Sequence, residues 1–587
     1  MTGNPHQGGD DAEVAALSPA TNGTPRQVGK LSHQQPTLVY PVAVSFNLVD
    51  DPWLPVSRRG EVREVSLRTA LLESQGIDGL ALAPATLMVA VFRQTLLPLV
   101  IDALGAPRDS RDWVTRREQG CFDAQVLEAY LEQYRDRFNV FDPVAPFAQV
   151  AGLRTAKDEV KPSSLLVPAL PTGNNVPLFG SRVEDDPPAL PWAQALCWTL
   201  HTHCWDTAAI KSGAVGDPKA KNGKTTGNPT GSLGYLGIVV PTGPTLFETL
   251  LLNLPIVPAD PRPGSNGGQD RPQWGRPPAG PSWSERPAEG ILDLLTWQSR
   301  RIRLIPSIDD RTGETVVTHV VVAAGDRLLS TPEYEPHTAW TITSSRKGEP
   351  ALPRPRRHRS GRAAWRGLDA LVAGRAPTGN EPSAATSLLL RQIDDLQAED
   401  DFEENFPLGI EIVGVEYGNQ SAIVDNVIHD AIPMPVRALR AGLDVGEAVE
   451  RLARDADEIA KAVNVLEADL CRSLGGDLVP WDKGERASER LIYRLDRPAR
   501  RVLADLQRHP QKVEEVMPAW AQVARRAALD TADELLSTVP PAAIAGRTSD
   551  GRPHRASLAE LRFLAQLRTI LPKAEPNDPD VLTTTEE

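Results

Sequence analysis

At 587 residues the chain is too long for one hydrophobic core, so two or three domains are expected. Its composition, 41% hydrophobic and 24% charged, is ordinary for a globular protein. A net charge of −14 and a pI near 5.4 argue against a stand-alone DNA-binding protein, which would usually be basic, but allow a subunit with local basic loops in a larger assembly.

The amino-terminal stretch 1–41 is rich in Gly, Pro, Gln, Asn and Thr and lacks the apolar core of a signal peptide. We predict a disordered tail there and a second one at 576–587. No run of about 18 apolar residues appears, so no membrane span is expected and the predicted localisation is cytoplasmic. Four cysteines are too few for a disulfide scaffold.

The folded part begins with 46–56, Phe-Asn-Leu-Val-Asp-Asp-Pro-Trp-Leu-Pro-Val. Its two prolines favour extended backbone, and Trp53 between them can anchor the segment in a core. We therefore predict an edge strand that turns into a loop.

Two helices are predicted next, an apolar one at 81–104 entered through Pro84 and an amphipathic one at 126–138. Residues 141–182 then break into loops with many prolines. A long irregular stretch inside a compact domain is usually functional or disordered.

Cys197, His201 and Cys204 are spaced to share one helix face, so a metal site is one interpretation. Neither a fourth ligand nor a CxxC pair accompanies them. Because 192–200 is an apolar helical sequence, the other interpretation is that the two cysteines are small core residues. We expect no metal and no cofactor.

A Gly/Lys-rich loop, defined here as 211–237, contains Lys211, Lys219, Lys221 and Lys224 among glycines that let backbone N–H groups approach an anion. A nucleotide-binding enzyme using this loop is one hypothesis. The phosphate-loop pattern needs four residues between its glycines and a preceding strand, whereas six residues separate the glycines here. A solvated flexible loop is the other interpretation.

Residues 258–287 are dense in Pro and Gly and predict an exposed loop. The alternating segments 300–306 and 315–322, with a turn signal at 310–313, predict a β-hairpin. A basic, proline-punctuated loop at 346–366 is suited either to phosphate contacts or simply to solvation.

The last 150 residues have helical periodicity. Apolar residues spaced alternately by four and three predict the seam of a bundle helix: Val445, Val449, Leu452, Ala456, Ile459, Val463, Leu466 and Leu470. Further helices are predicted at about 487–507, 511–536 and 557–571. The expected fold is α+β, with a large irregular mixed α/β domain (42–425) followed by a four-helix bundle (430–575).

Several of these motifs, in this order, resemble the CasA family, the large subunit of the type I-E CRISPR surveillance complex, Cascade. They are 46–56, Phe-Asp-Pro-Val-Ala-Pro-Phe-Ala-Gln at 141–149, Leu-Thr-Trp-Gln within 295–304, and Gly-Asn-Gln-Ser-Ala at 418–422. The resemblance covers roughly residues 42–575. Ala145 stands where the family usually has His.

The resemblance implies a set of nucleic-acid contacts. In the family, the Asn of the Asn-Gln segment contacts the PAM (the short motif beside the target) and the Gln acts as a wedge beneath it, which here are Asn419 and Gln420, followed by Ser421. The glycine-loop position corresponds to Gly180, Ser181 and Arg182, and the lysine-finger position to Arg311. Candidate contacts to crRNA or the DNA backbone are Arg154, Lys157, Lys161, Lys219, Lys221 and Lys224.

The function implied is PAM recognition in double-stranded DNA, the start of strand separation and R-loop formation, and recruitment of a helicase-nuclease in antiviral defence. The implied partners are crRNA, the other Cascade subunits, target DNA and that nuclease. No catalytic residue is expected. The alternatives are the nucleotide-binding enzyme and a purely architectural subunit, in which 418–422 is an ordinary turn capping a helix.

Overall fold

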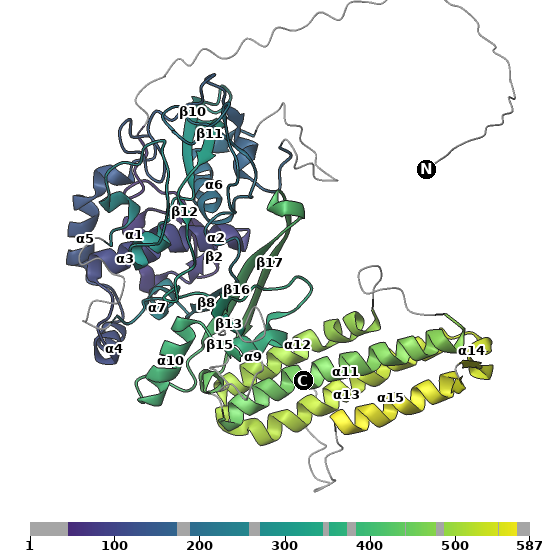
Figure 1. Cartoon of the computed structure of the whole chain (residues 1–587). Helices are drawn as coiled ribbons and strands as arrows, with labels where there is room; N and C mark the ends of the chain where they lie inside the picture. Colours follow the sequence, from purple (N-terminus) through teal and green to yellow (C-terminus); the bar gives the residue numbers. More distant parts are fainter. Residues whose placement is uncertain are drawn as a thin grey trace, which may run out of the picture. The chain divides into compact units, whose positions relative to one another are not determined.

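The computed structural model describes residues 45–172, 188–257, 270–343, 352–371, 383–440, 442–476, 486–549 and 551–571 (Figure 1). These residues belong to one compact unit. Helices and strands are mixed as far as β17 (Val424–Pro433), and helices dominate after it, so the chain combines a mixed α/β part with a C-terminal helical region. The tails predicted at 1–41 and 576–587 lie outside the described residues.

The prediction of an edge strand at 46–56 is wrong in two respects: a turn comes first, and the strand that begins at Leu54 pairs with a neighbour on each side and is central in its sheet. The Asn47 carbonyl accepts the N–H of Asp51 (2.8 Å), while the Asn47 N–H donates to the Asp51 carboxylate (2.7 Å). These local polar contacts compete with extended backbone. Trp53 is buried, as predicted for an anchor, and its indole N–H donates to a backbone carbonyl (3.1 Å).

The amino-terminal elements are a small sheet, in the order β2-β1-β3, and a set of helices. The strands are β1 (Leu54–Arg58), β2 (Glu61–Val65) and β3 (Gly79–Leu80). The helices are α1 (Leu67–Leu72), α2 (Ala85–Val91), α3 (Leu97–Leu104), α4 (Ser110–Gln119) and α5 (Ala124–Gln133). The helix predicted at 126–138 is therefore α5 followed by a 3-10 turn, Arg135–Phe138.

The helix predicted at 81–104 is confirmed from Ala85 onward, where α2 continues through a π-helical turn, Phe92–Leu96, into α3. By length and composition, Ala85–Leu104 is the one helical stretch among the described residues that could cross a membrane, which was not expected. It behaves as a core helix, because 78% of its most apolar window is buried inside the fold. It also carries Arg93, which is fully buried and pairs with Glu335 (2.7 Å).

The predicted hairpin at 300–322 is confirmed and forms the centre of the largest sheet. Its strands are β10 (Arg300–Ile308) and β11 (Thr315–Ala324), and short strands join it: β4 (Lys161–Pro162), β5 (Leu190–Pro191), β6 (Lys211–Ser212) and β7 (Lys224–Thr225). The buried helix α6 (Trp192–Trp205) packs on β10 and β11. This packing places the end of α6 beside the first residues of β10.

A second hairpin carries the segment that resembles the Asn-Gln motif. Its strands are β16 (Gly409–Tyr417) and β17 (Val424–Pro433), and β8 (Ile238–Thr242) pairs with β16 on the other side. A third sheet contains β13 (Trp340–Thr343), β14 (Leu352–Pro355) and β15 (Ser383–Ala385), and β9 (Glu285–Arg286) pairs with β12 (Arg327–Leu328). The remaining helices of this part are α7 (Leu246–Leu252), α8 (Ile291–Leu295), α9 (Leu368–Leu371) and α10 (Leu388–Ala398).

The C-terminal region contains the four long helices that periodicity predicts. They are α11 (Asp444–Ser473), α12 (Ala487–Arg508), α13 (Val513–Ser537) and α15 (Ala556–Ile570); α12, α13 and α15 each pack against α11. All eight predicted seam residues of α11 are buried. The short helix α14 (Pro541–Ala545) and the hairpin of β18 (Arg547–Ser549) and β19 (Arg552–His554) were not predicted.

Polar contacts join the helical region to the hairpin β16–β17. Arg500 on α12 donates to Asp430 (2.7 Å) and to the Ala431 carbonyl (2.6 Å), both on β17. The indole N–H of Trp365 donates to Asp496 of the same helix (2.9 Å). The base of the hairpin is therefore fixed to α12.

At the other end of the hairpin, the carboxylate of Asp206 just after α6 is shared by two cations. It pairs with Lys211 Nζ (2.6 Å) and with the Arg300 guanidinium, which also donates to the carbonyls of Thr207 (3.0 Å) and Pro229 (2.7 Å). Burial alone would raise the pKa of Asp206, but the two cations outweigh burial and bring the pKa to about 2. We call these three residues the Asp206 triad; it joins the end of α6, the start of β10 and β6.

We predict that Asp206→Ala lowers the free energy of unfolding by about 3–5 kcal/mol, because it leaves two buried cations without their anion. The side chains of Arg300 and Lys211 are only 1% and 8% exposed, so water cannot replace the carboxylate. Urea unfolding followed by tryptophan fluorescence measures the loss. Since the pKa of Asp206 is depressed, the stabilisation is present at neutral pH and disappears as the pH falls from about 4 toward 2.

The matched control is the double variant Asp206→Asn/Lys211→Met, which removes one cation together with the anion. It should be more stable than Asp206→Asn alone. An unchanged unfolding free energy in Asp206→Ala would contradict the role of the triad.

A second prediction concerns Asp455, a buried carboxylate on α11. Its Oδ2 has no hydrogen-bond donor among the described residues, and Arg451 Nε lies 3.6 Å away. Burial raises the pKa of Asp455 to about 6, so its ionisation lowers the stability of the fold as the pH rises from about 4 to about 6, and this cost stays constant above that range. Asp455→Asn should therefore raise the thermal unfolding midpoint at alkaline pH, and the gain should shrink as the pH falls through about 6.

Asp469, also buried on α11, is the matched control because it pairs with Arg472 and Arg562 (3.0 Å each). Asp469→Asn should lower the midpoint at alkaline pH. Thermal unfolding followed by far-ultraviolet circular dichroism over a pH series compares the two variants. A rise in the midpoint of Asp455→Asn that did not depend on pH would count against burial of the carboxylate as its cause.

Candidate nucleic-acid interface

The segment 418–422 forms the tip of the hairpin β16–β17 (Figure 1). The turn is closed by a bond from the Ser421 N–H to the Gly418 carbonyl (2.8 Å). Asn419 and Gln420 are exposed, and within the described part of the chain their side-chain amides have no partner. The segment 418–422 is therefore a hairpin tip and not a helix cap. It presents the side-chain amides of Asn419 and Gln420, each of which can both donate and accept hydrogen bonds.

The tip has an unusual backbone. Gln420 and Ser421 have φ angles of +55° and +54°, the left-handed region that favours glycine. Two successive side-chain-bearing residues in this conformation cost of order 1 kcal/mol or more each, and such strain is often found at functional sites. The conformation projects Gln420 from the end of a rigid hairpin.

Neighbouring segments hold this strained turn. The Ala208 N–H donates to the Ser421 carbonyl (2.8 Å), and the Tyr235 hydroxyl lies 3.2 Å from Ser421 Oγ. Below the tip, the Tyr417 hydroxyl donates to the Trp205 carbonyl (2.7 Å). Residues 205 and 208 flank Asp206, so the Asp206 triad also fixes the main chain on which the tip rests.

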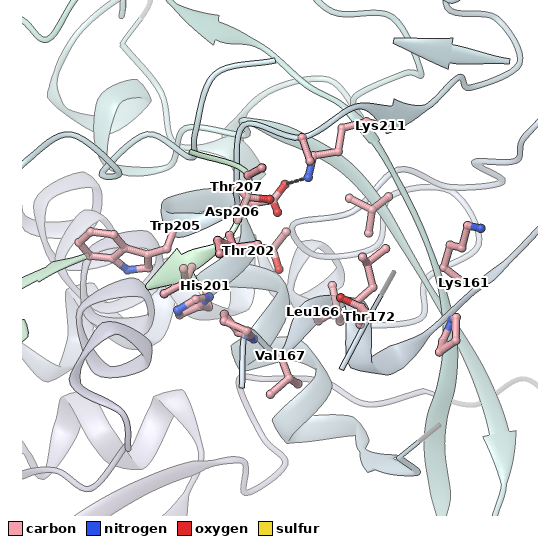
Figure 2. A pocket seen from close by; sticks show the side chains of 18 of the residues that line it. Lys161, Leu166, Val167, Thr172, His201, Thr202, Trp205, Asp206, Thr207 and Lys211 are labelled. Carbon is pink, nitrogen blue, oxygen red and sulfur yellow. Dashed lines mark ion pairs between the residues drawn. The ribbon is translucent and has the colours of Figure 1, made fainter. Parts of the chain in front are cut away.

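Two cavities flank this hairpin. The first, of about 260 Å³, is lined by Lys161, Thr202, Asp206, Lys211 and residues 422–424. Figure 2 shows Lys211 directed at Asp206 on one wall and Lys161 on the opposite side. Among the described residues that line this cavity, Lys211 is paired with Asp206, whereas Lys161 is exposed and forms no ion pair.

The second cavity, of about 880 Å³, is lined by the described part of the basic segment, including Arg356, Arg357, Arg359 and Arg362, and by Glu416 and Asp425 of the hairpin. His358 adds no charge at neutral pH, because burial lowers its pKa more than its bond to the Ile238 carbonyl raises it. Arg357 is exposed and stacks over Tyr235, with its guanidinium carbon 4.3 Å from the ring centroid. Arg362 pairs with Asp457 (3.4 Å), whereas Arg357 and Arg359 are exposed and form no ion pair with the described residues. These two guanidinium groups suit phosphate oxygens.

The Gly/Lys-rich loop lacks the features of a phosphate loop. The Asp217 carboxylate fills its interior, accepting bonds from Lys219 N–H (2.9 Å), Thr225 Oγ1 (3.3 Å) and Trp283 Nε1 (3.1 Å). Most of its glycines permit close packing: a Cβ on Gly231 would lie 2.4 Å from the end of α6, whereas Gly223 and Gly227 have open space beside them. An anionic centre and packed glycines do not form a cradle for an anion.

The lysines of this loop differ from one another. Lys211 is buried in the Asp206 triad, and Lys219 is held over Trp283, with Nζ 3.8 Å from the ring centroid. Lys221 and Lys224 are exposed at the end of the β6–β7 hairpin. The sequence grouped Lys211 with the other three lysines as a source of charge, but its ion pair with Asp206 uses that charge inside the fold.

The other candidate cations lie on two further loops. The loop carrying Arg154 and Lys157 is joined to the Gly/Lys-rich loop by a bond from the Val215 N–H to the Arg154 carbonyl (2.9 Å). Both side chains are exposed, although Arg154 is 3.5 Å from Asp158. Arg311 is exposed at the tip of β10–β11, a different hairpin from the one that carries Asn419. Gly180, Ser181 and Arg182 lie outside the described residues.

The residues considered as metal ligands are core residues. Cys197, His201 and Cys204 are buried; His201 Nε2 lies 3.1 Å from Thr86 Oγ1, and Cys204 Sγ accepts a bond from Gln94 (3.2 Å). Among the described residues no cluster of three or more His, Cys, Asp or Glu side chains could hold a metal. Burial lowers the pKa of His201 to about 3, so the ring is neutral.

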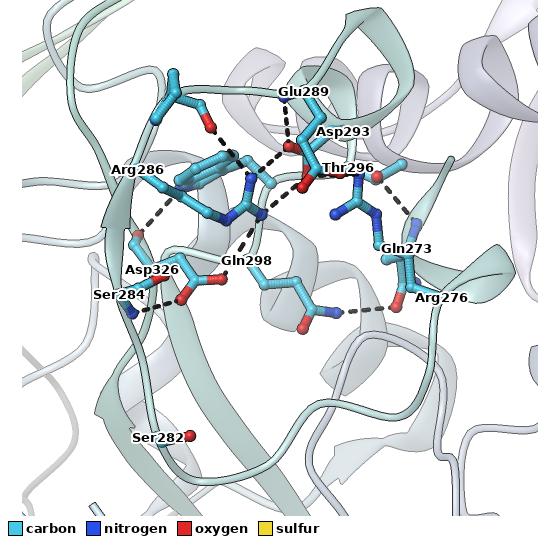
Figure 3. Close-up of polar contacts among 12 residues, drawn as sticks. Gln273, Arg276, Ser282, Ser284, Arg286, Glu289, Asp293, Thr296, Gln298 and Asp326 are labelled. Atoms are coloured by element: carbon cyan, nitrogen blue, oxygen red, sulfur yellow. Dashed lines mark hydrogen bonds and ion pairs between the residues drawn. The ribbon is translucent and has the colours of Figure 1, made fainter. Parts of the chain in front are cut away.

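Two of the motifs behind the family resemblance are structural. Trp297 and Gln298 precede β10 and do not lie on a strand; Gln298 donates to Gln273 (2.9 Å) in a polar cluster whose centre is the pair Arg286–Asp293 (Figure 3). The loop predicted at 258–287 is partly buried in its described portion, because Trp274 is a core residue.

The other structural motif is 141–149. Gln149 is buried and ties this loop to β10 by accepting a bond from the Leu304 N–H (2.8 Å). Sequence reasoning missed the roles of Tyr235, Tyr417 and Arg357 near the hairpin tip. An aromatic residue among glycines at 231–237 was the available signal for Tyr235.

Known proteins are similar to this chain in sequence and in fold. The family model for CRISPR-associated protein Cse1 matches residues 47–531. A CasA/Cse1 protein of Thermus thermophilus is 28% identical over 443 residues, 74% of this chain and 79% of that protein. Thermobifida fusca Cse1 has a TM-score of 0.77 at 33% identity, covering 90% of this chain and 99% of that one.

Acidimicrobium ferrooxidans Cse1 has a TM-score of 0.74 at 29% identity, covering 90% of this chain and 98% of that one. A chain solved as part of a CRISPR RNA-guided surveillance complex shares the fold, with a TM-score of 0.61 at 22% identity over 89% of this chain and 99% of that one. Because the family model spans most of the sequence and the fold agrees over nine-tenths of it, the chain belongs to the Cse1 (CasA) family of CRISPR-associated proteins.

Proposed function

We propose that this chain is the large subunit of a type I-E Cascade complex and recognises the PAM in double-stranded target DNA. Family membership supports this, as does the shared fold with a chain of a CRISPR RNA-guided surveillance complex. In such complexes crRNA pairing reads the target sequence, so the protein reads only a short motif. A chain of net charge −14 suits this role, since crRNA and the other subunits hold the rest of the target.

The exposed, unpartnered amides of Asn419 and Gln420 on a strained hairpin tip carry the proposal. The Asn419 amide donates hydrogen bonds to, and accepts them from, the base edges of the PAM in the minor groove. These edges carry a degenerate pattern of acceptors and one donor, which a single amide can match. Gln420 enters the base step next to the PAM, trading a few kcal/mol of stacking for an opened duplex. The Asp206 triad beneath the tip holds Gln420 in position while the duplex opens.

Basic side chains around the tip hold the nucleic-acid backbone in this proposal: Arg154, Lys157, Lys161, Lys219, Lys221, Lys224 and Arg311, with Gly180, Ser181 and Arg182 at the minor groove and Ser421 beside the wedge. The α/β domain (42–425) engages the PAM. The C-terminal helices (430–575) act as a four-helix bundle that rearranges to hold the displaced strand. The subunit then recruits the helicase-nuclease, works in the cytoplasm and carries no catalytic residue.

We predict that Asn419→Ala weakens binding of assembled Cascade to PAM-bearing duplex by about 1–3 kcal/mol and leaves binding to PAM-scrambled duplex unchanged. Gln420→Ala should keep most of the binding but slow opening. Titration of labelled duplex measures the first effect, and 2-aminopurine fluorescence beside the PAM measures the second.

The controls use the same hairpin. Gln420→Gly removes the side chain and also relieves the left-handed backbone strain. If the side chain is the wedge, this variant should slow duplex opening as much as Gln420→Ala does. Asn426→Ala alters an exposed amide residue on β17 away from the tip and should have no effect. A purely architectural subunit would instead leave every one of these variants active.

The nucleotide-binding alternative makes a different prediction. Because Asp217 occupies the centre of the Gly/Lys-rich loop, we expect calorimetry to show no micromolar ATP binding by the chain. ATP binding that is lost in Lys224→Ala would favour the enzyme and contradict this proposal.

A further inference from the structure

A third cavity, of about 280 Å³, lies where the turn after α5 meets the segments on either side of α8. It shares no lining residue with the two cavities beside the hairpin β16–β17. Figure 3 shows part of its wall, where Gln273, Arg276 and Gln298 lie around the pair Arg286–Asp293. The proposed function makes no use of this cavity.

The lining of this cavity is rich in arginine. Its charged side chains, among the described residues, are four arginines and two aspartates: Arg137, Arg276, Arg286, Arg301, Asp293 and Asp326. Two of the arginines are matched by the aspartates. Arg286 donates to Asp293 through both terminal nitrogens (2.5 and 3.0 Å), and Arg301 pairs with Asp326 (2.9 Å). The surplus of positive charge therefore lies on Arg137 and Arg276.

These two remaining arginines lie next to each other and differ in their partners. Arg276 Nη2 contacts Glu289 (2.9 Å) and Asp293 (3.2 Å), and Arg276 Nε donates to a backbone carbonyl (2.8 Å). Arg137 donates to the Arg276 carbonyl (3.0 Å) but forms no ion pair with any described residue. Arg137 is thus a half-buried guanidinium without a matching carboxylate.

The burial of Arg137 has an energetic cost. Burial lowers the pKa of Arg137 because the charged form loses hydration, and the carboxylate of Asp142 opposes this only in part. That carboxylate accepts the N–H groups of Val144 (2.9 Å) and Ala145 (2.6 Å). Charges that are taken out of water are normally paired, so an anion in the cavity would supply the missing partner.

The cavity also has hydrogen-bond donors that lack acceptors. Arg137 Nε and Gln273 Nε2 have no partner within the described part of the chain, and Arg276 Nη1 forms no bond there. The oxygen of the Gln273 side chain is already used, because it accepts a bond from Gln298 (2.9 Å). Guanidinium and amide N–H groups from separate segments suit an ion with several acceptor oxygens.

The size of the cavity favours a small ion. Pockets that hold drug-sized ligands usually have roughly 300–1,000 Å³, and this cavity falls just below that range. Much of the remaining lining is apolar, including Pro146, Pro277 and Pro278. An apolar wall strengthens the attraction between an enclosed anion and the arginines.

We infer that this cavity binds one tetrahedral oxyanion, inorganic phosphate or sulfate, between Arg137 and Arg276, with the Gln273 amide as a further donor. The ion neutralises Arg137 and joins the turn after α5 to the segment before α8. Gln149, which also lines the cavity, is bonded to Leu304 of β10. The ion therefore stabilises the packing of the loop 141–149, and it does so independently of the proposed function.

The test follows thermal unfolding of the full chain at rising phosphate concentration, with chloride keeping the ionic strength constant. A ligand that binds only the folded state raises the midpoint by mass action, so the midpoint should climb with phosphate. Sulfate, which has the same shape, should act in the same way, and chloride alone should not. Calorimetric titration with phosphate should give one site per chain.

Arg137→Met is the decisive variant because it removes the charge and keeps most of the side-chain length. It should weaken phosphate binding about 10- to 100-fold, since it removes a charge-assisted hydrogen bond. Without phosphate its midpoint should equal or exceed that of the unaltered chain, because an unpaired charge is gone. If Arg137 only held the turn in place, the variant would instead be less stable at every phosphate concentration.

Gln273→Met is a second variant, and it should weaken phosphate binding about 10-fold. Arg271→Gln is the matched control, because Arg271 is an exposed arginine on the same segment and does not line the cavity. It should keep the full response to phosphate. Lys224→Ala in the Gly/Lys-rich loop should keep it as well.

Four results would overturn the inference. A midpoint that ignores phosphate would mean that water fills the cavity, and an equal response to chloride would reflect ionic strength alone. A phosphate response that persists in both Arg137→Met and Gln273→Met would place the ion elsewhere. Adenosine monophosphate binding more tightly than phosphate would show that the site holds a nucleotide and not a free ion.

Discussion

The carboxylate of Asp206 lies between two buried cations, Lys211 and Arg300, where α6, β10 and the Gly/Lys-rich loop meet. On either side of it, the backbone groups of residues 205 and 208 bond to Tyr417 and Ser421 of the hairpin β16–β17. A turn with two left-handed, non-glycine residues persists only when its surroundings hold it in place. The backbone groups of residues 205 and 208 supply that support, and the triad between them holds their main chain in place, as the wedge role proposed for Gln420 requires.

Charge in this protein is organised locally. Some cations that look free in the sequence are used for folding: Lys211 is buried, Lys219 is held over Trp283, and Arg500 fixes α12 to β17. Arg357 and Arg359 beside the hairpin, and Arg497 and Arg501 on α12, are exposed and form no ion pair among the described residues. An acidic chain can therefore present basic surfaces along a short path, as expected of a subunit that shares its ligand with an RNA and other proteins.

The long helices and the central hairpin could be predicted because their hydrophobic periodicity is strong; all eight seam residues of α11 are buried. The turn at 48–51 could not, because local bonds between Asn47 and Asp51 replace the strand expected for the start of this segment. Asn419 and Gln420 were located through a resemblance, since exposed amides leave no periodic signal. The support from Asp206, Tyr235 and Tyr417 comes from segments far apart in the sequence and needed the structure.

The most direct test of the central claim is R-loop formation by Cascade reconstituted with and without this chain, on matched duplexes that differ only in the PAM. The account predicts opening that requires both the chain and the PAM and that is impaired by Gln420→Ala. Equal opening without the chain, or opening that ignores the PAM, would contradict it.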